Sequence, residues 1–208
     1  MRFTIKDVAK KANTSVATVS RVMNNSTNVS PDLRKKVQKV IKELNYQPNE
    51  VAKSLKKEKT NMIGVLISDI TNPFFSSIVK GIEDVLGKEN YTIILGNTAE
   101  SVDIEKKYIN KLINKQIDGF IISSTSDYGE HFSSLINTKI PLVFVNRHPE
   151  NIDNNLILTD NIRGGYIGTK HLIELGHRKI GVILGPQNLN TGKERRLGYE
   201  KALNEYNI

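Results

Sequence analysis

The residues TIKDVAKKA at positions 4–12, followed after two residues by SVATVSRVMN at positions 15–24, decide the fold of the N-terminal segment. Apolar residues of the first stretch recur at i, i+3, i+4 and i+7, which predicts a helix with one apolar face. Ser15 is a favoured N-cap residue and predicts where a second helix begins. Two short helices joined by so tight a turn are typical of proteins that place a recognition helix in the DNA major groove.

The second predicted helix has an unusual outward face. We expect Val19, Val22 and Met23 to face inward. The outward residues are then Val16, Ala17, Thr18, Ser20 and Arg21. This face is small and polar for a solvated helix, but it suits a helix that lies close to base edges and phosphates. The pattern therefore predicts a surface that contacts duplex DNA.

The positive charge of the chain is concentrated at its N-terminal end. Residues 1–60 contain 14 Lys and Arg against 5 Asp and Glu, a net charge of +9. Residues 61–208 contain 16 against 17, a net charge of −1. Such asymmetry indicates a polyanionic partner for the N-terminal segment. The alternative, a basic domain that is merely soluble, leaves the helix pattern unexplained.

Composition limits the remaining classes of protein. A chain of 208 residues suits one or two domains with a real core. The chain contains no cysteine, which fits a reducing compartment. The charged N-terminus has no signal-peptide core, and no apolar run approaches the length of a membrane span. We expect a cytoplasmic protein that binds no membrane and needs no metal or cofactor.

A third helix and a hinge complete the predicted N-terminal domain. Ser30 is expected to cap this helix, with Pro31 at its first position. Its apolar stripe consists of Leu33, Val37, Val40, Ile41 and Leu44, and the lysines opposite are expected to be mostly solvated. Residues 49–57 predict a helix of about two turns, which is marginal alone and needs a partner copy or DNA to form. Residues 1–60 are thus expected to form a headpiece with a hinge helix.

From residue 61 the pattern changes to alternating strands and helices. Strands are expected at residues 62–67, 91–95, 119–123, 141–145 and 156–159, and helices follow the first three. The first of these helices opens at Asn72-Pro73, and its expected buried side is Phe75, Ile78, Val79, Ile82, Val85 and Leu86. This order predicts an α/β fold with a doubly wound parallel sheet, in which residues 61–160 form a first lobe.

A second, smaller unit is expected at residues 161–208. Its pattern predicts a helix at residues 164–175, a strand at 180–184 and a helix at 194–206. One strand cannot bury two helices and would expose open edges. We therefore expect a partial second lobe that is exposed and mobile, and a truncated chain whose interlobe cleft is non-functional in this form.

Motifs along the whole chain resemble one known family. They are TI-x-DVA at 4–9, S-x-x-TVSRV-x-N at 15–24, L-x-Y-x-PN at 44–49, NPFF at 72–75, K-x-x-DG at 115–119, LGH-x-x-I at 175–180 and R-x-x-GY at 195–199. The chain closely resembles the lac-repressor/galactose-repressor (LacI/GalR) family of bacterial transcriptional regulators. The resemblance implies an all-α helix-turn-helix headpiece and a two-lobed core like that of the periplasmic sugar-binding proteins. It also implies a dimer that binds pseudo-palindromic operator DNA and responds to a small effector held between the lobes.

The resemblance assigns roles within the headpiece. Val16, Ala17 and Arg21 are implied as base readers, because Arg can hold guanine by two hydrogen bonds while Val and Ala contact thymine methyl groups. Leu55 matches the hinge-helix leucine that wedges between base pairs in the minor groove. A buried contact with the headpiece is the alternative for Leu55. The implied DNA-binding residues are Thr4, Ser15, Val16, Ala17, Thr18, Ser20, Arg21, Asn24, Asn49, Ala52, Lys53 and Leu55.

The resemblance also implies an effector site. Phe74 is expected to face the ligand, whereas Phe75 suits either the ligand or the core. Asn146 and Arg147 end a strand at its carboxyl edge, where ligands bind in open parallel sheets. The implied effector-binding residues are Asn72, Phe74, Phe75, Asn146, Arg147, Asp160, Thr191 and Arg195. Polar groups around aromatic rings suit a sugar, a sugar phosphate or a purine-like effector.

Two other classes of protein compete with a regulator. An enzyme has little support, because no G-x-G-x-x-G follows the first strand and the four histidines show no metal-ligand spacing. The stretch GPQNLNTGKE at 185–194 has six residues between its glycines and Glu where a phosphate loop needs Ser or Thr. A secreted solute-binding protein would need a signal peptide and no headpiece. The sequence therefore predicts a DNA-binding transcriptional repressor with no catalytic residues.

Overall fold

The computed structural model describes residues 3–47, 59–152 and 155–208. The chain divides into two compact units, Met1–Glu58 and Lys59–Ile208. The predicted hinge helix at 49–57, with its candidate residues Asn49, Ala52, Lys53 and Leu55, lies outside the described residues.

The headpiece is a bundle of three helices, as predicted. They are α1 (Ile5–Lys11), α2 (Val16–Met23) and α3 (Pro31–Glu43). Their apolar faces meet in one core of small side chains made of Val8, Ala9, Ala12, Val19, Val22, Val37 and Val40. Ser30 holds the N-cap position of α3 but makes no side-chain hydrogen bond to the helix, so its expected capping role is wrong.

The turn between α1 and α2 is formed by local backbone geometry. Asn13 has a φ of 48°, in the left-handed region that Asn tolerates better than most residues. Ser15 then caps α2 by accepting a hydrogen bond from the Thr18 amide at 3.1 Å. The short break in the sequence is therefore a tight helix-to-helix turn, as the helix-turn-helix pattern predicted.

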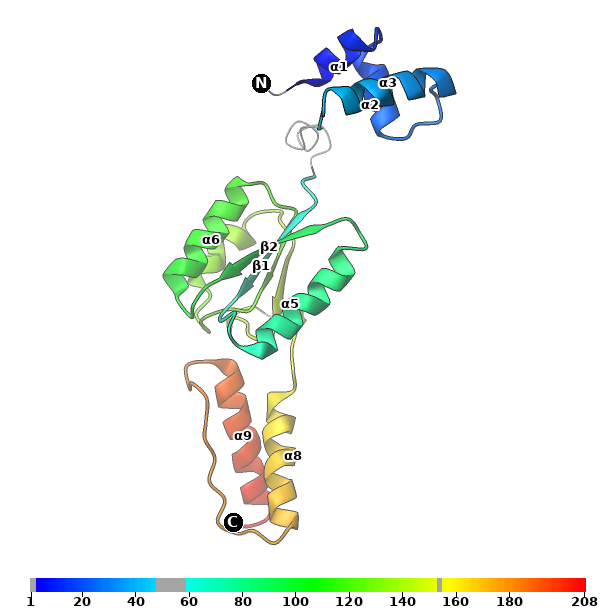
Figure 1. Cartoon of the computed structure of the whole chain (residues 1–208). Helices are drawn as coiled ribbons and strands as arrows, with labels where there is room; N and C mark the ends of the chain where they lie inside the picture. The colour runs from blue at the N-terminus through cyan, green and yellow to red at the C-terminus, as the bar shows by residue number, and fades with distance from the viewer. Residues whose placement is uncertain (1–2, 48–58, 153–154) are drawn as a thin grey trace. The chain divides into compact units, whose positions relative to one another are not determined.

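The second unit is built on a sheet of five parallel strands (Figure 1). The strands are β1 (Met62–Ile67), β2 (Thr92–Asn97), β3 (Gly119–Ile122), β4 (Leu142–Val145) and β5 (Leu156–Ile157). Their order is β2-β1-β3-β4-β5, and every neighbouring pair is parallel. Since β2 lies on one side of β1 and β3 on the other, the order of the strands reverses at β1. Sheets of this kind bind ligands at such a switch point, at the carboxyl ends of the strands.

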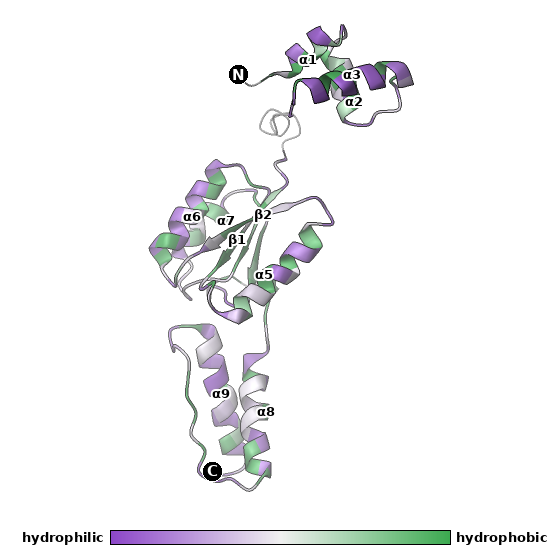
Figure 2. Cartoon of the chain, viewed as in Figure 1, coloured by the Kyte–Doolittle hydropathy of each residue, from purple (hydrophilic) through white to green (hydrophobic). Residues whose placement is uncertain are grey.

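Helices cover both faces of this sheet (Figure 1). One face packs on α5 (Pro73–Leu86), and the other packs on α6 (Val102–Asn114), the 3-10 helix η1 (Glu130–Phe132) and α7 (Ser133–Ile136). Adjacent residues of β1 alternate between the two cores, with Val65 in the first and Leu66 in the second. The strands are accordingly coloured as hydrophobic in Figure 2. The doubly wound fold is confirmed.

The expected buried side of α5 is wrong at one residue, because Val85 is 63% exposed. At about 100° per residue, Val85 is rotated by roughly 80° from Phe75, whereas Leu86 is rotated by only about 20°. Val85 therefore lies at the edge of the apolar stripe, and Leu86 takes the central position.

Residues 161–208 form a helical hairpin in which α8 (Asn161–Glu174) and α9 (Asn190–Glu205) lie side by side (Figure 1). Both helices begin a few residues earlier than the sequence predicted. Two glycines allow the close approach. A Cβ on Gly165 would collide with the carbonyl of Arg195, and one on Gly198 would collide with the carbonyl of Ile162.

The strand expected at residues 180–184 is wrong. This segment has no strand assignment, and no strand lies beside it in the described part of the chain. A strand exists only where a neighbour supplies its hydrogen bonds, so an apolar run alone does not form one. One polar contact holds the segment to α9, because the Tyr199 hydroxyl donates to the Ile180 carbonyl at 2.8 Å.

Candidate nucleic-acid interface and effector cleft

The first turn of each of α1 and α2 is fixed by local hydrogen bonds. The Thr4 amide and hydroxyl both donate to Asp7 Oδ2, at 2.8 and 2.7 Å, and form a capping box with the Asp7 amide. These bonds hold the pKa of Asp7 below its ordinary value. At α2, the Ser15 and Thr18 hydroxyl oxygens lie 2.9 Å apart. The two helices that would present DNA contacts therefore start at defined positions.

The outward face of α2 is the one predicted from the sequence. Val19 and Val22 are buried, whereas Val16 is 40% exposed and Ala17 and Arg21 are exposed. Among the described residues, none pairs with the Arg21 guanidinium. The N–H groups of the Arg21 guanidinium are thus available to donate hydrogen bonds to an external acceptor.

The charges of the described headpiece are strongly positive. Residues 3–47 contain 9 Lys and Arg against 3 Asp and Glu. Two of the three acids are engaged, Asp7 by Thr4 and Glu43 by the Lys11 ammonium at 2.9 Å. Asn24 at the end of α2 donates to the Ser20 hydroxyl at 3.5 Å, which brings these two implied DNA-binding residues together. A positive surface of this kind attracts a polyanion.

In the second unit, the predicted effector residue Arg147 contacts residues that follow different strands. It follows β4 at the carboxyl edge of the sheet, and its Nη1 donates to Ser68 Oγ at 3.2 Å and to Glu100 Oε1 at 3.3 Å. Its guanidinium carbon lies 5.7 Å from the centre of the Phe75 ring. Arg147 therefore bridges the loops that follow β1, β2 and β4.

The two phenylalanines at the start of α5 have different environments. Asn72 caps α5 by accepting from the Phe74 amide at 3.0 Å. Phe75 is 2% exposed and belongs to the core between α5 and the sheet, whereas Phe74 is 46% exposed. Phe74 thus stands open at the sheet edge, and the core position of Phe75 is the alternative that the sequence left open.

Asn146 shapes the end of β4. It has a φ of 65° and is 8% exposed, and its amide donates to the Ile157 carbonyl at 2.9 Å. The left-handed backbone at this residue turns the chain out of the strand. The residue that follows, Arg147, is thereby directed toward the loop after β1.

The remaining predicted effector residues form a separate group on the helical hairpin. Asp160 caps α8 by accepting from the Arg163 amide at 2.8 Å, and Arg195 Nε donates to Asn161 Oδ1 at 2.9 Å. Thr191 is buried in the first turn of α9. Within the described ranges, no hydrogen bond joins this group to Phe74 or Asn146.

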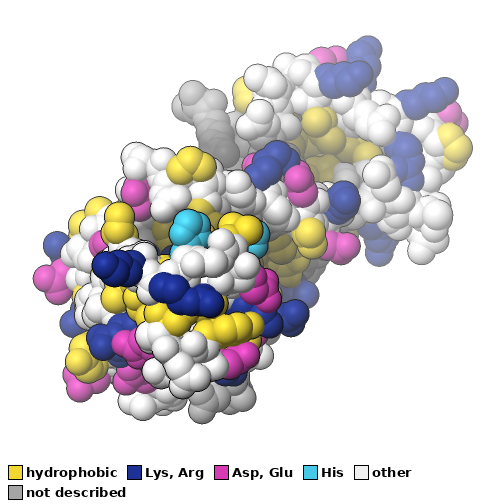
Figure 3. Space-filling model, turned by 90° about the horizontal axis from the view of Figure 1, so that it is seen from below, with side chains coloured by type: hydrophobic (Ala, Val, Ile, Leu, Met, Phe, Trp, Pro, Cys, Tyr) yellow, Lys and Arg dark blue, Asp and Glu magenta, His cyan; other side chains and the backbone are white. Residues whose placement is uncertain are grey.

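A hollow also lies on the hairpin, with a volume of about 630 Å³. Of the predicted effector residues it includes Asp160 alone, so it is a different feature from the sheet-edge group around Arg147. The face seen from the hairpin side mixes apolar, basic and acidic side chains (Figure 3). Exposed apolar residues of the hairpin include Ile162, Ile167, Leu172, Leu175 and Leu197.

Several polar contacts of the second unit were not predicted from the sequence. Ser68 and Glu100 contact Arg147, and an ion-pair group joins Asp127 and Glu150 to Lys193 of α9. Lys193 lies in the stretch that the sequence analysis compared with a phosphate loop. For Asp127, which is 66 residues away from Lys193, no sequence signal existed.

Comparison with known families agrees with this geometry. Residues 4–49 match the family described as bacterial regulatory proteins, lacI family. Residues 60–207 match the periplasmic binding proteins and sugar binding domain of the LacI family. The chain therefore belongs to the LacI family.

Individual relatives are similar along the whole chain. The chain is 40% identical over 207 residues to the HTH-type transcriptional repressor PurR of Aliivibrio salmonicida, covering 99% of this chain and 62% of the relative. It is 40% identical over 206 residues to the ribose operon repressor of Halalkalibacterium halodurans, covering 99% and 61%. Its fold matches the lac repressor dimer bound to operator and the anti-inducer ONPF, with a TM-score of 0.87, 28% identity, and coverage of 100% and 63%. The chain thus spans about three fifths of the length of these relatives.

No helix in the described part of the chain is both long and apolar enough to cross a membrane.

Proposed function

We propose that this chain belongs to a transcriptional repressor that binds operator DNA as a homodimer. In this proposal residues 1–60 are the DNA-binding headpiece, residues 61–160 the first lobe of an effector-binding core, and residues 161–208 part of the second lobe. Leu55, with Asn49, Ala52 and Lys53, is assigned to the hinge that enters the minor groove. The two family matches, over residues 4–49 and 60–207, and the names of the similar repressors support the headpiece and the effector-binding core.

One observation carries the DNA-binding role. The outward face of α2 is small, and it ends in an Arg21 guanidinium that no described residue engages. A capped helix with a short outer face can enter the major groove, and a free Arg can bind guanine O6 and N7 together. Val16 and Ala17 are then placed against base edges, and Thr18, Ser20 and Asn24 against phosphates.

We assign the effector to the carboxyl edge of the sheet. Arg147, which contacts Ser68 and lies over the Phe75 ring, offers a cation, and Phe74 and Asn72 at the start of α5 offer an exposed ring and a polar group. Such a set suits a sugar, a sugar phosphate or a purine-like molecule. The similar ribose operon repressor supports a sugar. Arg195, Thr191 and Asp160 are assigned to the opposite wall of the same cleft.

The proposed protein acts in the cytoplasm by binding and not by catalysis. Its relatives are named as repressors, which supports this role. Incubating the chain with sugars and nucleotides, with product analysis, tests the alternative directly. Product formation faster than in a blank without the chain would contradict the regulator proposal and show that the chain is an enzyme.

The DNA-binding proposal is tested by titrating a fluorescent duplex at several salt concentrations. If each dimer neutralises roughly 6–10 phosphates, the affinity should fall about 10³–10⁵-fold between 50 and 200 mM salt. Binding that does not depend on salt would contradict the electrostatic assignment of the headpiece.

The effector proposal is tested with Arg195→Ala, made in a full-length form of the protein whose effector cleft is complete. We expect the variant to bind operator like the unmodified chain but to lose its response to the effector, because an effector shifts only states that it contacts differently. A thermal-shift screen of sugars, sugar phosphates and purines first identifies the effector. Calorimetry that finds unchanged effector affinity in Arg195→Ala would exclude the residue from the site.

A further inference from the structure

The N-cap residue of α9 does not cap the helix with its side chain. Leu189 holds the N-cap position and makes no side-chain hydrogen bond to the helix. The first turn, residues 190–193, contains no acidic side chain and ends in Lys193. Because first-turn amides need acceptors and the helix dipole favours negative charge there, a lysine at this position is unfavourable by itself. Local acceptors serve three of the amides, because Asn190 Oδ1 accepts from the Thr191 amide at 2.9 Å and the Leu189 carbonyl accepts from the Gly192 and Lys193 amides at 3.0 and 3.1 Å. The acceptor for the Asn190 amide and the negative charge come from another part of the chain.

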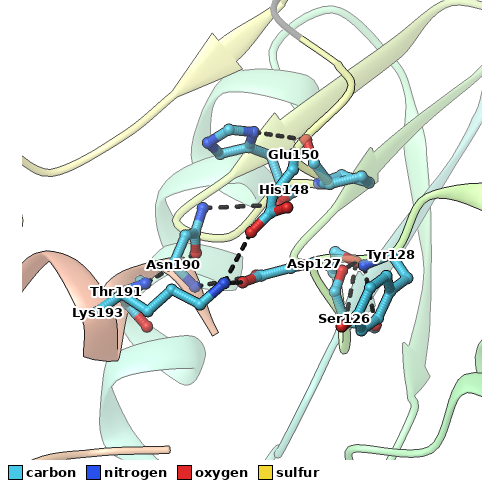
Figure 4. Close-up of polar contacts among 10 residues, drawn as sticks. Ser126, Asp127, Tyr128, His148, Glu150, Asn190, Thr191 and Lys193 are labelled. Atoms are coloured by element: carbon cyan, nitrogen blue, oxygen red, sulfur yellow. Dashed lines mark hydrogen bonds and ion pairs between the residues drawn. The ribbon is translucent and has the colours of Figure 1, made fainter. Parts of the chain in front are cut away.

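Two loops of the first lobe supply them (Figure 4). The Asn190 amide donates to Asp127 Oδ1 at 2.9 Å. Lys193 Nζ donates to Asp127 Oδ2 at 3.0 Å and to Glu150 Oε1 at 2.7 Å. One carboxylate therefore both caps the helix and pairs with its lysine, across 63 and 66 residues of sequence.

Bonds within the first lobe also hold Asp127 in place. Its side chain is 3% exposed, and its carbonyl accepts from the Glu150 amide at 2.9 Å, which joins the two loops. The Ser126 amide donates to Ser124 Oγ at 3.3 Å, and the Ser124 hydroxyl donates back to the Ser126 carbonyl at 2.7 Å. The acceptor is thus presented by a loop whose conformation its own bonds determine.

A neighbouring buried group braces the same loop. Thr125 donates to Glu105 Oε2 at 3.1 Å, and His131 Nε2 lies 2.6 Å from that oxygen. Glu105 belongs to α6 and is fully buried, so the loop is anchored to the layer of helices beneath it. Docking α9 then requires little reorganisation of the first lobe.

The lysine stays charged in this setting. Hydrogen bonds to Glu150 and then to Asp127 raise the pKa of Lys193 above its ordinary value. Its side chain is 42% exposed, so salt in the solvent screens the ion pairs. Asp127 is the buried partner and the one that also satisfies a backbone amide, so its loss should matter more.

We propose that Asp127, Glu150 and Lys193 form an interlobe clasp that keeps the first turn of α9 helical only while this helix is docked on the first lobe. Thr191 lies in that turn, and Arg195 lies one turn further along. Docking therefore fixes the positions of two residues that are assigned to the effector site. An effector that contacts these residues stabilises the docked state in return. The link to the effector rests on the proposed function, whereas the clasp itself does not.

Residue-resolved hydrogen exchange by NMR tests the clasp without DNA and without an effector. Asp127→Ala removes both the cap and the ion pair, so the amides of residues 190–193 should exchange about fivefold faster or more. Amides of residues 199–204 should keep their rates. Lys193→Met should give about a twofold increase at the same first-turn amides. Lys179→Met is the matched control, because Lys179 is exposed and no described residue pairs with it, and it should change nothing.

Asp127→Asn separates the two roles, since its Oδ1 still accepts from Asn190 while the negative charge is lost. We expect an intermediate increase, and this variant also serves if Asp127→Ala fails to fold. Unchanged exchange at Asn190 in both Asp127 variants would overturn the clasp. An equal increase along the whole of α9 would also overturn it, because the loss would then be global. No effect of Lys193→Met would remove the lysine from the clasp. If the chain shows this exchange pattern but does not bind duplex DNA, the repressor proposal is refuted and the clasp proposal stands.

Discussion

The headpiece and the α8–α9 hairpin are both small helical units, but they are held together in different ways. The headpiece buries a continuous core in which Val8, Val19 and Val37 are fully inaccessible. The hairpin buries few apolar side chains, and its helices meet through Gly165 and Gly198. At the start of α9, the acceptor for the Asn190 amide comes from the first lobe. The headpiece is therefore stabilised by its own core, whereas the hairpin depends in part on contacts with the first lobe.

The largest effect should follow from placing a charge in the headpiece core. Val19→Asp buries an unpaired carboxylate among apolar side chains and should cost about 4 kcal/mol or more, enough to unfold so small a unit. Circular dichroism should show the loss of headpiece helix. Ile167→Asp is the matched change in the hairpin, where the side chain is 52% exposed, and it should be nearly neutral. Equal losses from the two variants would break the comparison.

A glycine pair tests how the hairpin is packed. Gly165→Ala places a Cβ against the Arg195 carbonyl and should destabilise the hairpin by about 1–3 kcal/mol. Gly168→Ala, one turn along the same helix, meets nothing within 4 Å. It should stabilise the helix by roughly 0.5–1 kcal/mol, because glycine is unfavourable in a helix interior. Urea unfolding followed by exchange in α8 measures both, and stabilisation by both variants would show that the helices do not approach closely.

The smallest effect should come from acid titration of the headpiece. Thr4 hydrogen bonds hold the pKa of Asp7 below its ordinary 3.8. A lowered folded pKa means that this stabilisation is present above the ordinary value and is lost as the pH falls through the lowered one. Asp7→Ala should therefore lower the thermal midpoint of the headpiece at about pH 5 but not at about pH 2. A difference that stays constant over this range would show that Asp7 acts by packing.

The sequence predicted the features that depend on neighbouring residues. The headpiece helices and the strands of the first lobe could be predicted from periodicity. The spacing of apolar residues along one segment is enough to show which of its faces is buried. The prediction of a strand at residues 180–184 was wrong, because a strand needs a neighbouring strand to bond with. The sequence of one segment does not show whether such a neighbour exists. The predicted burial of Val85 was wrong because this residue lies at the edge of the apolar stripe of α5. The pairing of Asp127 with Lys193 joins residues far apart in sequence and became visible only in the fold.

The central claim is that the outward face of α2 reads DNA sequence, and selection from a pool of randomised duplexes tests it most directly. The unmodified chain should enrich inverted repeats. Arg21→Ala should lose the preference at one base pair in each half-site, at a cost of about 1–3 kcal/mol in binding free energy. Lys42→Ala, an exposed lysine of α3, should keep the same preferences as a control. Enrichment of the same repeats, with the same base preferences, by Arg21→Ala and the unmodified chain would contradict the claim.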